Sequence, residues 1–203
     1  FFVKDLPSSG GSKLVTCAAD GKVMLMTLDE GRYESVQIAR HNGRAHRLAI
    51  HPYLPNQIYS CGEDGRLNFI DIRHSHISDV AESGHYFNFR ALKDQGCVNA
   101  SVYDKGVMTT CFRAPNANAR STVSSIYCIS VNPFKEYEIA CCGESSAVAM
   151  YDTRFFEKPF GYLMPNHLRG ENKHISGVKH DCTGREIIAS YNDEDIYSFN
   201  IAE

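Results

Sequence analysis

The feature that most constrains this chain is an internal repeat, because a sequence that repeats at a regular spacing folds as a series of similar units. Four segments align without a gap, and their first residues are separated by 44, 81 and 48 positions. The spacing of 81 fits either one repeat plus an insertion or two repeats of which one has degraded. The segments start at Leu14, Ile58, Ile139 and Ile187, and two positions are apolar or bulky in every copy: Val23, Leu67, Val148 and Ile196, then Met26, Ile70, Tyr151 and Phe199.

Each segment has the pattern of two β-strands joined by a tight turn. A short apolar run leads into a polar turn, and alternating apolar residues follow it. The dipeptides Asp20-Gly21 and Asp64-Gly65 supply the positive φ that a tight hairpin requires. No stretch has the 3.6-residue periodicity of an amphipathic helix. The repeats are therefore predicted to be β-hairpins and not helix pairs.

Further strands complete each repeat. Short apolar runs at 45–52, 126–133 and 174–181 precede three of the hairpins, and residues 33–40 alternate like an outer strand. Four strands in about 45 residues is the period of a WD-repeat β-propeller blade. The sequence therefore predicts an all-β fold made of propeller blades.

The length of the chain limits the number of blades. With 203 residues and about 45 residues per blade, four blades fit. We place the repeats at about 1–40, 41–92, 121–165 and 170–203, with an insertion at about 93–120. WD propellers usually close with more blades, commonly seven. We therefore expect residues 1–203 to form an open part of a larger, seven-bladed WD40 β-propeller.

Composition excludes several other classes of protein. The chain has 21 Lys+Arg against 24 Asp+Glu, and it contains no run of five residues with the same charge. This argues against direct nucleic-acid binding, which requires clustered cations. The longest uncharged stretch is too short and too polar for a transmembrane helix, and we expect no secretion signal because the first residues run directly into Lys4-Asp5. The 8 cysteines lie mostly in apolar runs, so we expect reduced, buried thiols and an intracellular protein.

Several stretches resemble one family, the cullin-4-associated WD-repeat proteins. These are substrate receptors that dock on the damaged-DNA-binding adaptor of cullin-4 ubiquitin ligases. The branch numbered eight, which is WD-repeat protein 42A-like, is the most similar, and the branch numbered six follows it. The most specific stretch is the acidic turn followed by Ile-Tyr near the C-terminal end. The matching stretches are residues 14–23, 46–73, 126–154 and 187–200.

The resemblance implies which residues engage the adaptor. Two repeats end in an apolar or aromatic residue, Asp, any residue and Arg, as the family motif does. It implies that Arg73 and Arg154 face the adaptor, and that Asp71 and Asp152 fix the ends of their strands. An Arg just past a strand presents a planar fork of donors to a partner. Local pairing of each Arg with its own Asp is the alternative, because many WD proteins with no ligase role carry the same motif.

Other polar residues are expected to be structural. WD repeats are named for a Trp-Asp pair, and this chain contains no Trp. The buried His–Ser–Asp network of WD blades can form at most in the second repeat, through His41, Ser60 and Asp64. The same trio admits a catalytic-triad interpretation, but no nucleophile elbow accompanies it. Asp20 and Asp193 are expected to stabilise hairpin turns.

These observations favour a protein–protein interaction module that is not an enzyme. We expect a substrate receptor of a cullin-4 ligase, with the damaged-DNA-binding adaptor and unidentified substrate proteins as partners. The alternatives are a WD40 scaffold of another complex, such as a chromatin or trafficking complex, and a propeller enzyme. We expect no cofactor, no metal site, no direct nucleic-acid contact and no membrane contact. Residence in the nucleus and cytoplasm is implied by the resemblance alone.

Overall fold

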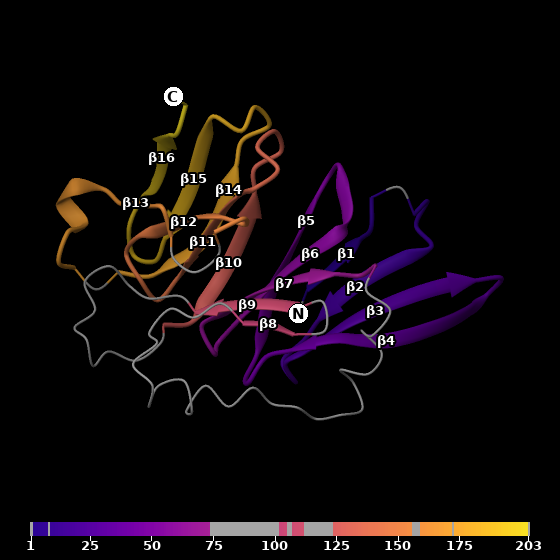
Figure 1. Ribbon diagram of the computed structural model, residues 1–203. Helices are drawn as coiled ribbons and strands as arrows, with labels where there is room; N and C mark the ends of the chain where they lie inside the picture. Colours follow the sequence, from indigo (N-terminus) through magenta and orange to yellow (C-terminus); the bar gives the residue numbers. More distant parts are fainter. Residues whose placement is uncertain are drawn as a thin grey trace.

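The computed structural model describes residues 2–7, 9–73, 102–104, 107–111, 124–155, 159–171 and 173–202 (Figure 1). Within these residues the chain forms four antiparallel sheets and one short 3-10 helix, η1 (Asn166–Leu168). No helix in this part of the chain has the length and apolar character needed to cross a membrane. The all-β prediction is therefore confirmed, and together with the sequence repeat the architecture is that of a partial β-propeller.

In three of the sheets, successive strands pair side by side as a meander, whereas the second sheet departs from chain order. The first sheet contains β1 (Phe2–Asp5), β2 (Lys13–Cys17), β3 (Lys22–Asp29) and β4 (Arg32–Arg40). The second contains β5 (Ala45–His51), β6 (Leu54–Gly62), β7 (Arg66–Asp71), β9 (Val107–Cys111) and β8 (Val102–Asp104), and β9 lies between β7 and β8. The third contains β10 (Ile126–Val131), β11 (Glu138–Gly143), β12 (Val148–Asp152) and β13 (Gly161–Leu163), and the fourth β14 (Ile175–His180), β15 (Glu186–Tyr191) and β16 (Ile196–Asn200).

The second sheet differs from the sequence-based expectation. Residues 93–120 are predicted to be an insertion, yet β9 lies within this range and pairs with β7 along its whole length. β8 then pairs with β9 as a fifth strand. The outer strands of this sheet, β8 and β9, are thus formed by residues whose pairing with β7 no turn motif in the sequence predicts.

The hairpin turns form because their sequences allow a positive φ. Gly21 has a φ of 79°, and a side chain there would lie 2.4 Å from the carbonyl oxygen of His41. In the fourth sheet Asp193 takes the corresponding role with a φ of 56°, a conformation that Asp tolerates better than most residues. Both turns therefore agree with the expected hairpins.

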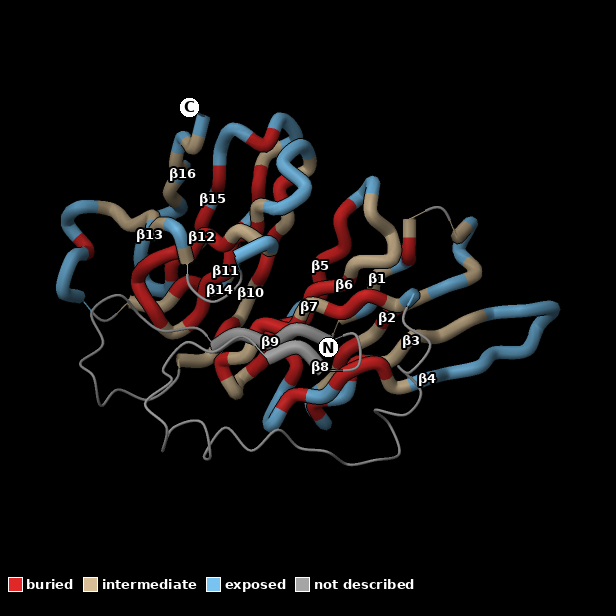
Figure 2. The backbone as a smooth tube through the Cα atoms, in the orientation of Figure 1, coloured by how far each residue is buried: buried red, intermediate tan, exposed pale blue. Residues whose placement is uncertain are grey.

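The core lies between neighbouring sheets in three separate layers (Figure 2). Innermost strand β10 contacts both β5 and β14, so the sheets pack around their first strands. Strand β11 is apolar on both faces: Cys141 packs toward the second sheet, and Cys142 packs toward the fourth. A strand buried on both faces needs a continuous apolar run, and this explains the sequence Ile-Ala-Cys-Cys.

Candidate functional site: the Asp-x-Arg face

Two equivalent Asp-x-Arg turns end the third strands of adjacent sheets. Asp71 is the last residue of β7, and Asp152 is the last residue of β12. Each carboxylate accepts a hydrogen bond from the backbone N–H two residues later, at 3.0 Å from Arg73 and 2.9 Å from Arg154. This Asx turn bends the chain sharply after the strand. The geometry places both Arg side chains at the same end of their sheets.

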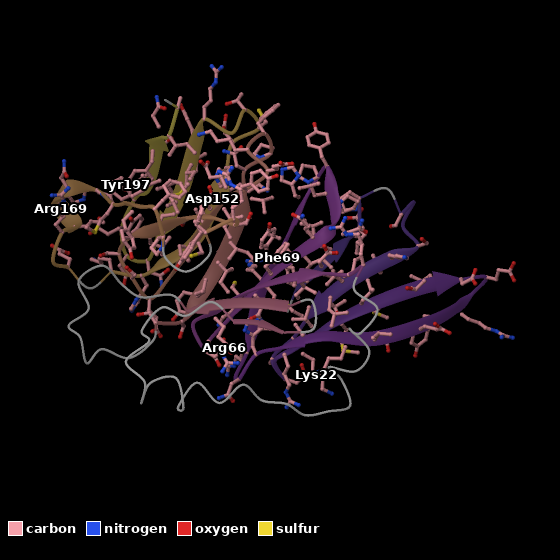
Figure 3. The ribbon with its side chains drawn as sticks, viewed as in Figure 1. Lys22, Arg66, Phe69, Asp152, Arg169 and Tyr197 are labelled. Atoms are coloured by element: carbon pink, nitrogen blue, oxygen red, sulfur yellow. The ribbon has the colours of Figure 1, made fainter. Side chains whose placement is uncertain are left out.

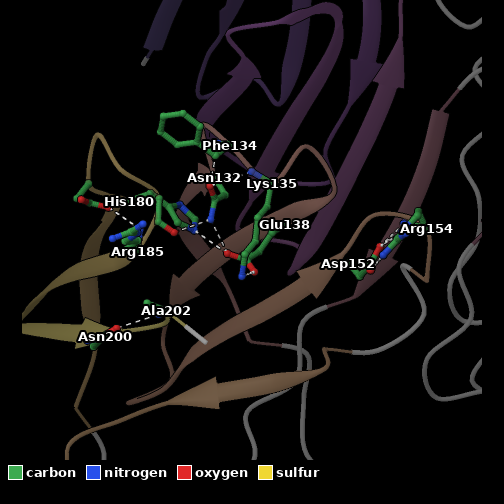
Figure 4. Close-up of polar contacts among 12 residues, drawn as sticks. Asn132, Phe134, Lys135, Glu138, Asp152, Arg154, His180, Arg185, Asn200 and Ala202 are labelled. Carbon is green, nitrogen blue, oxygen red and sulfur yellow. Dashed lines mark hydrogen bonds and ion pairs between the residues drawn. The ribbon is translucent and has the colours of Figure 1, made fainter.

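Each Arg side chain forms a two-point ion pair with its own Asp. In the third sheet, Arg154 Nε donates to Asp152 Oδ1 at 3.0 Å and Nη2 donates to Oδ2 at 2.7 Å (Figure 4). In the second sheet, Arg73 Nε donates to Asp71 Oδ1 at 2.9 Å, and Nη2 contacts Oδ2. The pairing with Arg154 lowers the pKa of Asp152 and raises the pKa of the Arg154 guanidinium.

Local pairing does not bury these guanidinium groups. The Arg73 side chain is 63% exposed and the Arg154 side chain is 57% exposed. The two-point geometry orients each guanidinium, although screening by water and salt keeps the energy of an exposed ion pair small. The two side chains are therefore held in a defined direction while most of their surface remains open to solvent.

Aromatic side chains surround Arg154. Its guanidinium lies 4.6 Å from the centre of the Tyr137 ring, within the range of a cation–π contact. Tyr53, Phe134 and Phe160 are exposed nearby. They line an open groove of about 620 Å³ with His51, Lys135, Glu136, Tyr137, Glu138, Asp152 and Arg154. Exposed aromatic residues beside an Arg are the composition enriched at the centres of protein interfaces.

The structure brings together His41, Ser60 and Asp64. His41 Nδ1 lies 2.9 Å from Asp64 Oδ1, and Nε2 lies 2.9 Å from Ser60 Oγ. Because a carboxylate only accepts, Nδ1 donates to Asp64, and Nε2 shares the second hydrogen bond with the Ser60 hydroxyl. The Asn68 amide also lies 3.2 Å from Nε2. The backbone N–H groups of Asn42 and Arg66 donate to the same carboxylate at 2.8 and 3.1 Å.

The distances within this trio match those of a catalytic triad, but a substrate cannot reach the serine. Ser60 is fully buried and His41 is 2% exposed, so a substrate carbonyl has no route to the hydroxyl. Burial would raise the pKa of Asp64, but the hydrogen bond and charge of His41 outweigh it and lower that pKa. The arrangement is that of a structural relay tying the connection before β5 to the β6–β7 turn. The relay lies at the opposite end of β7 from Asp71, because Asp64 lies just before the start of the strand at Arg66, which is labelled in Figure 3, and Asp71 is its last residue.

The remaining predicted structural residues lie in exposed turns. Asp20 Oδ1 accepts from the backbone N–H of Lys22 at 3.0 Å, and Asp20 lies 3.8 Å from the Lys22 ammonium. The Asp193 carbonyl accepts from Lys173 at 3.4 Å. Neither aspartate is part of a buried network. The structure also holds no group of three or more metal-ligating side chains within its described residues.

A second buried histidine cluster was not predicted from the sequence. His180 Nδ1 lies 2.9 Å from Ser130 Oγ and joins β14 to β10. Figure 4 shows His180 beside Asn132 and Glu138. Beside it, Asn132 Nδ2 donates to Glu138 Oε1 at 2.7 Å and to the Gly184 carbonyl at 2.9 Å. One sequence signal points to this cluster: His51 and His180 end innermost strands, Asn132 directly follows the aligned strand β10, and all three are buried. Whereas the His41 relay lies within one repeat, this cluster links the third and fourth sheets.

Comparison with known proteins adds independent information. No family model matches the sequence. The human protein DDB1- and CUL4-associated factor 6 is 21% identical over 215 residues, covering 98% of this chain and 21% of that protein. The Arabidopsis thaliana Protein ALTERED SEED GERMINATION 2 is 25% identical over 225 residues, covering 99% of this chain and 28% of that protein.

A shorter match has higher identity. The mouse WD and tetratricopeptide repeats protein 1 is 37% identical over 75 residues, which cover 36% of this chain and 11% of that protein. The chain thus spans only a small part of each of these relatives. With the four-sheet fold, the similarities support a WD40 protein-interaction module.

Proposed function

We propose that this chain is part of a substrate receptor that docks on the damaged-DNA-binding adaptor of a cullin-4 ubiquitin ligase through its Asp-x-Arg face. The observation that carries the proposal is the pair of exposed, oriented guanidinium groups, Arg73 and Arg154, at equivalent ends of adjacent sheets. The similarity to DDB1- and CUL4-associated factor 6 over 98% of the chain supports the choice of partner. Assignment to the branch numbered eight remains a finer prediction.

The groove beside Arg154 supplies the apolar part of the same surface. An apolar side chain of the partner that docks in this groove would cover Tyr53, Phe134 and Phe160, which are exposed in the structure. Charged donors of Arg154 then lie at the edge of an apolar contact, where partner carboxylates or carbonyls give specificity. In this role the chain places a substrate near the ligase, and the covalent chemistry belongs to its partners.

Co-purification of the full-length polypeptide with the adaptor tests this proposal. The test variant is Arg73→Ala with Arg154→Ala. The matched control is Arg32→Ala with Arg169→Ala, which removes the same charge from exposed positions elsewhere; Arg169 lies well away from Asp152 (Figure 3). Because truncated interface Arg anchors cost roughly tenfold or more in affinity each, we expect the test variant to lose the adaptor and the control to retain it.

Unchanged thermal unfolding of the double variant shows that any loss is not due to misfolding. If wild type and test variant bind the adaptor equally, the Asp-x-Arg face is not the docking surface. If wild type does not bind at all, the module serves as a scaffold of another complex.

A further inference from the structure

Two cysteines oppose each other across strands β10 and β11. Cys128 is the direct register partner of Cys142 in this antiparallel pair. Opposed residues have Cα atoms about 4.5–5.5 Å apart and side chains on the same face of the sheet. A disulfide requires a Cα separation of roughly 4.4–6.8 Å. Both residues are free thiols in the structure, and the sheet already holds them at a separation that a disulfide can span.

The two thiols differ in their access to solvent. Cys142 is fully buried in the layer between the third and fourth sheets. Cys128 packs against the same layer but is only half-buried, and its Sγ lies 3.6 Å from the Val178 carbonyl of β14. A small oxidant can therefore reach Cys128 first, with Cys142 directly behind it. Cys141 packs on the other face of β11 with Cys61.

The surroundings also favour reaction at Cys128. A hydrogen bond from the Cys142 thiol is the largest cause that lowers the pKa of Cys128 to about 6, and the charge of Arg47 acts in the same direction. Burial raises the pKa of Cys142 well above its ordinary value. Because the thiolate is the nucleophile in thiol chemistry, Cys128 reacts first and Cys142 serves as the resolving thiol.

We propose that Cys128 and Cys142 form a redox modification site, in which hydrogen peroxide converts the opposed thiols to a reversible disulfide. This inference does not depend on the proposed ligase role. In the first step the Cys128 sulfur attacks a peroxide oxygen, the O–O bond breaks, and the leaving oxygen takes up a proton to form water. Cys128 is then a sulfenic acid.

In the second step the Cys142 sulfur attacks the Cys128 sulfur. The S–O bond breaks, and the hydroxyl leaves with the Cys142 proton as a second water. Overall two thiols lose two electrons and hydrogen peroxide is reduced to two waters. The disulfide removes the S–H group that contacts the Val178 carbonyl, so the change lies at the junction of the third and fourth sheets.

Peptide mapping of the full-length polypeptide tests the proposal. The reduced protein is treated with limited hydrogen peroxide, remaining thiols are alkylated, and the protein is digested with trypsin without reductant. Cleavage after Lys135 separates the two cysteines, since Cys128 falls in peptide 121–135 and Cys142 in peptide 136–154. We expect these two peptides to appear joined, with a mass two hydrogens below their sum. Dithiothreitol should separate them.

Variants identify the resolving thiol. Cys141→Ala should retain the link, whereas Cys142→Ala should lose it and leave Cys128 as a sulfenic acid that dimedone traps. The proposal is overturned if the wild-type peptides stay unlinked while the exposed Cys182 is oxidised, or if the link persists in Cys142→Ala. Because Cys141 and Cys142 share peptide 136–154, fragmentation of the linked wild-type peptides between these two residues identifies the bonded sulfur. The test therefore does not depend on the buried variants folding.

Discussion

Replacement of Asp64 by Asn gives a direct test of the buried relay in the second sheet. Asp64 accepts hydrogen bonds from His41 Nδ1 and from the backbone N–H groups of Asn42 and Arg66. Asn has nearly the same shape, but it has one acceptor oxygen and presents an NH₂ group at the position of the other. At least one donor therefore loses its partner, and all remaining bonds lose the negative charge.

The magnitude follows from the number and burial of these bonds. A hydrogen bond to a charged group contributes about 1.5–3 kcal/mol, and an unpartnered buried donor costs about 1–3 kcal/mol. The side chains of His41 and Asp64 are 0% and 7% exposed, so water does not compensate for the negative charge that is lost beside Nδ1. We expect Asp64→Asn to destabilise the second sheet by about 3 kcal/mol, since the exposed Asn42 N–H recovers a bond to water.

Amide hydrogen exchange of the full-length polypeptide reports this change locally. A loss of about 3 kcal/mol corresponds to a roughly 100-fold fall in protection for the amides of β6 and β7, while β15 should change little. The matched control is Asp20→Asn, in the equivalent turn of the first sheet. The Asp20 side chain is 54% exposed, so we expect an effect below about 0.5 kcal/mol.

Equal exchange in the two variants would refute the reasoning. It would mean that the relay adds nothing beyond an ordinary Asx turn. A uniform loss of protection across all four sheets would show instead that the sheets unfold as one unit, and that the local assignment is wrong.

Two further predictions follow from the same structure. Because the pKa values of Asp64 and Glu138 are lowered in the folded state, their stabilisation is present above the unfolded-state pKa of about 4 and is lost as the pH falls through the folded values. The thermal midpoint of wild type should therefore fall more steeply than that of Asp64→Asn between about pH 5 and about pH 3, and parallel curves would contradict this. Gly143→Ala should destabilise by about 2 kcal/mol or more, because its Cβ would lie 1.8 Å from the Ser125 carbonyl oxygen, whereas Gly177→Ala meets nothing within 4 Å. Similar thermal midpoints for the two Ala variants would show that the β11 end relaxes freely.

The hairpins could be predicted because their signals are local. Asp20-Gly21 lies between two apolar runs, and turn chemistry combined with alternation is sufficient to identify two strands. The outer strand of the second sheet has no such signal. Val107–Cys111 follows β7 only after a long connection, and long connections cost little closure entropy. β9 pairs with β7 because the edge of β7 opposite β6 is otherwise unpaired in the folded sheet, and the sequence around β9 contains no sign of that edge.

Polar residues at the junctions between sheets were harder to predict than those within a repeat. His41 could be assigned to Ser60 and Asp64 because all three belong to one repeat. His180 is buried because β10 of the preceding sheet places Ser130 against it. A side chain whose partner comes from a neighbouring repeat looks like an exposed polar residue in its own segment. Only the alignment of strand ends across repeats contains that information.

The two interpretations of the Asp-x-Arg motif are compatible. Arg154 uses Nε and Nη2 on Asp152, but a guanidinium has five N–H donors in a fixed plane. The pairing therefore leaves donors for a partner while it fixes the direction in which they point. Contact of the guanidinium with the Tyr137 ring restricts the side chain further. Because immobilising a flexible side chain is a cost of association, an Arg that is already held by its own Asp loses less freedom on docking than a mobile one would.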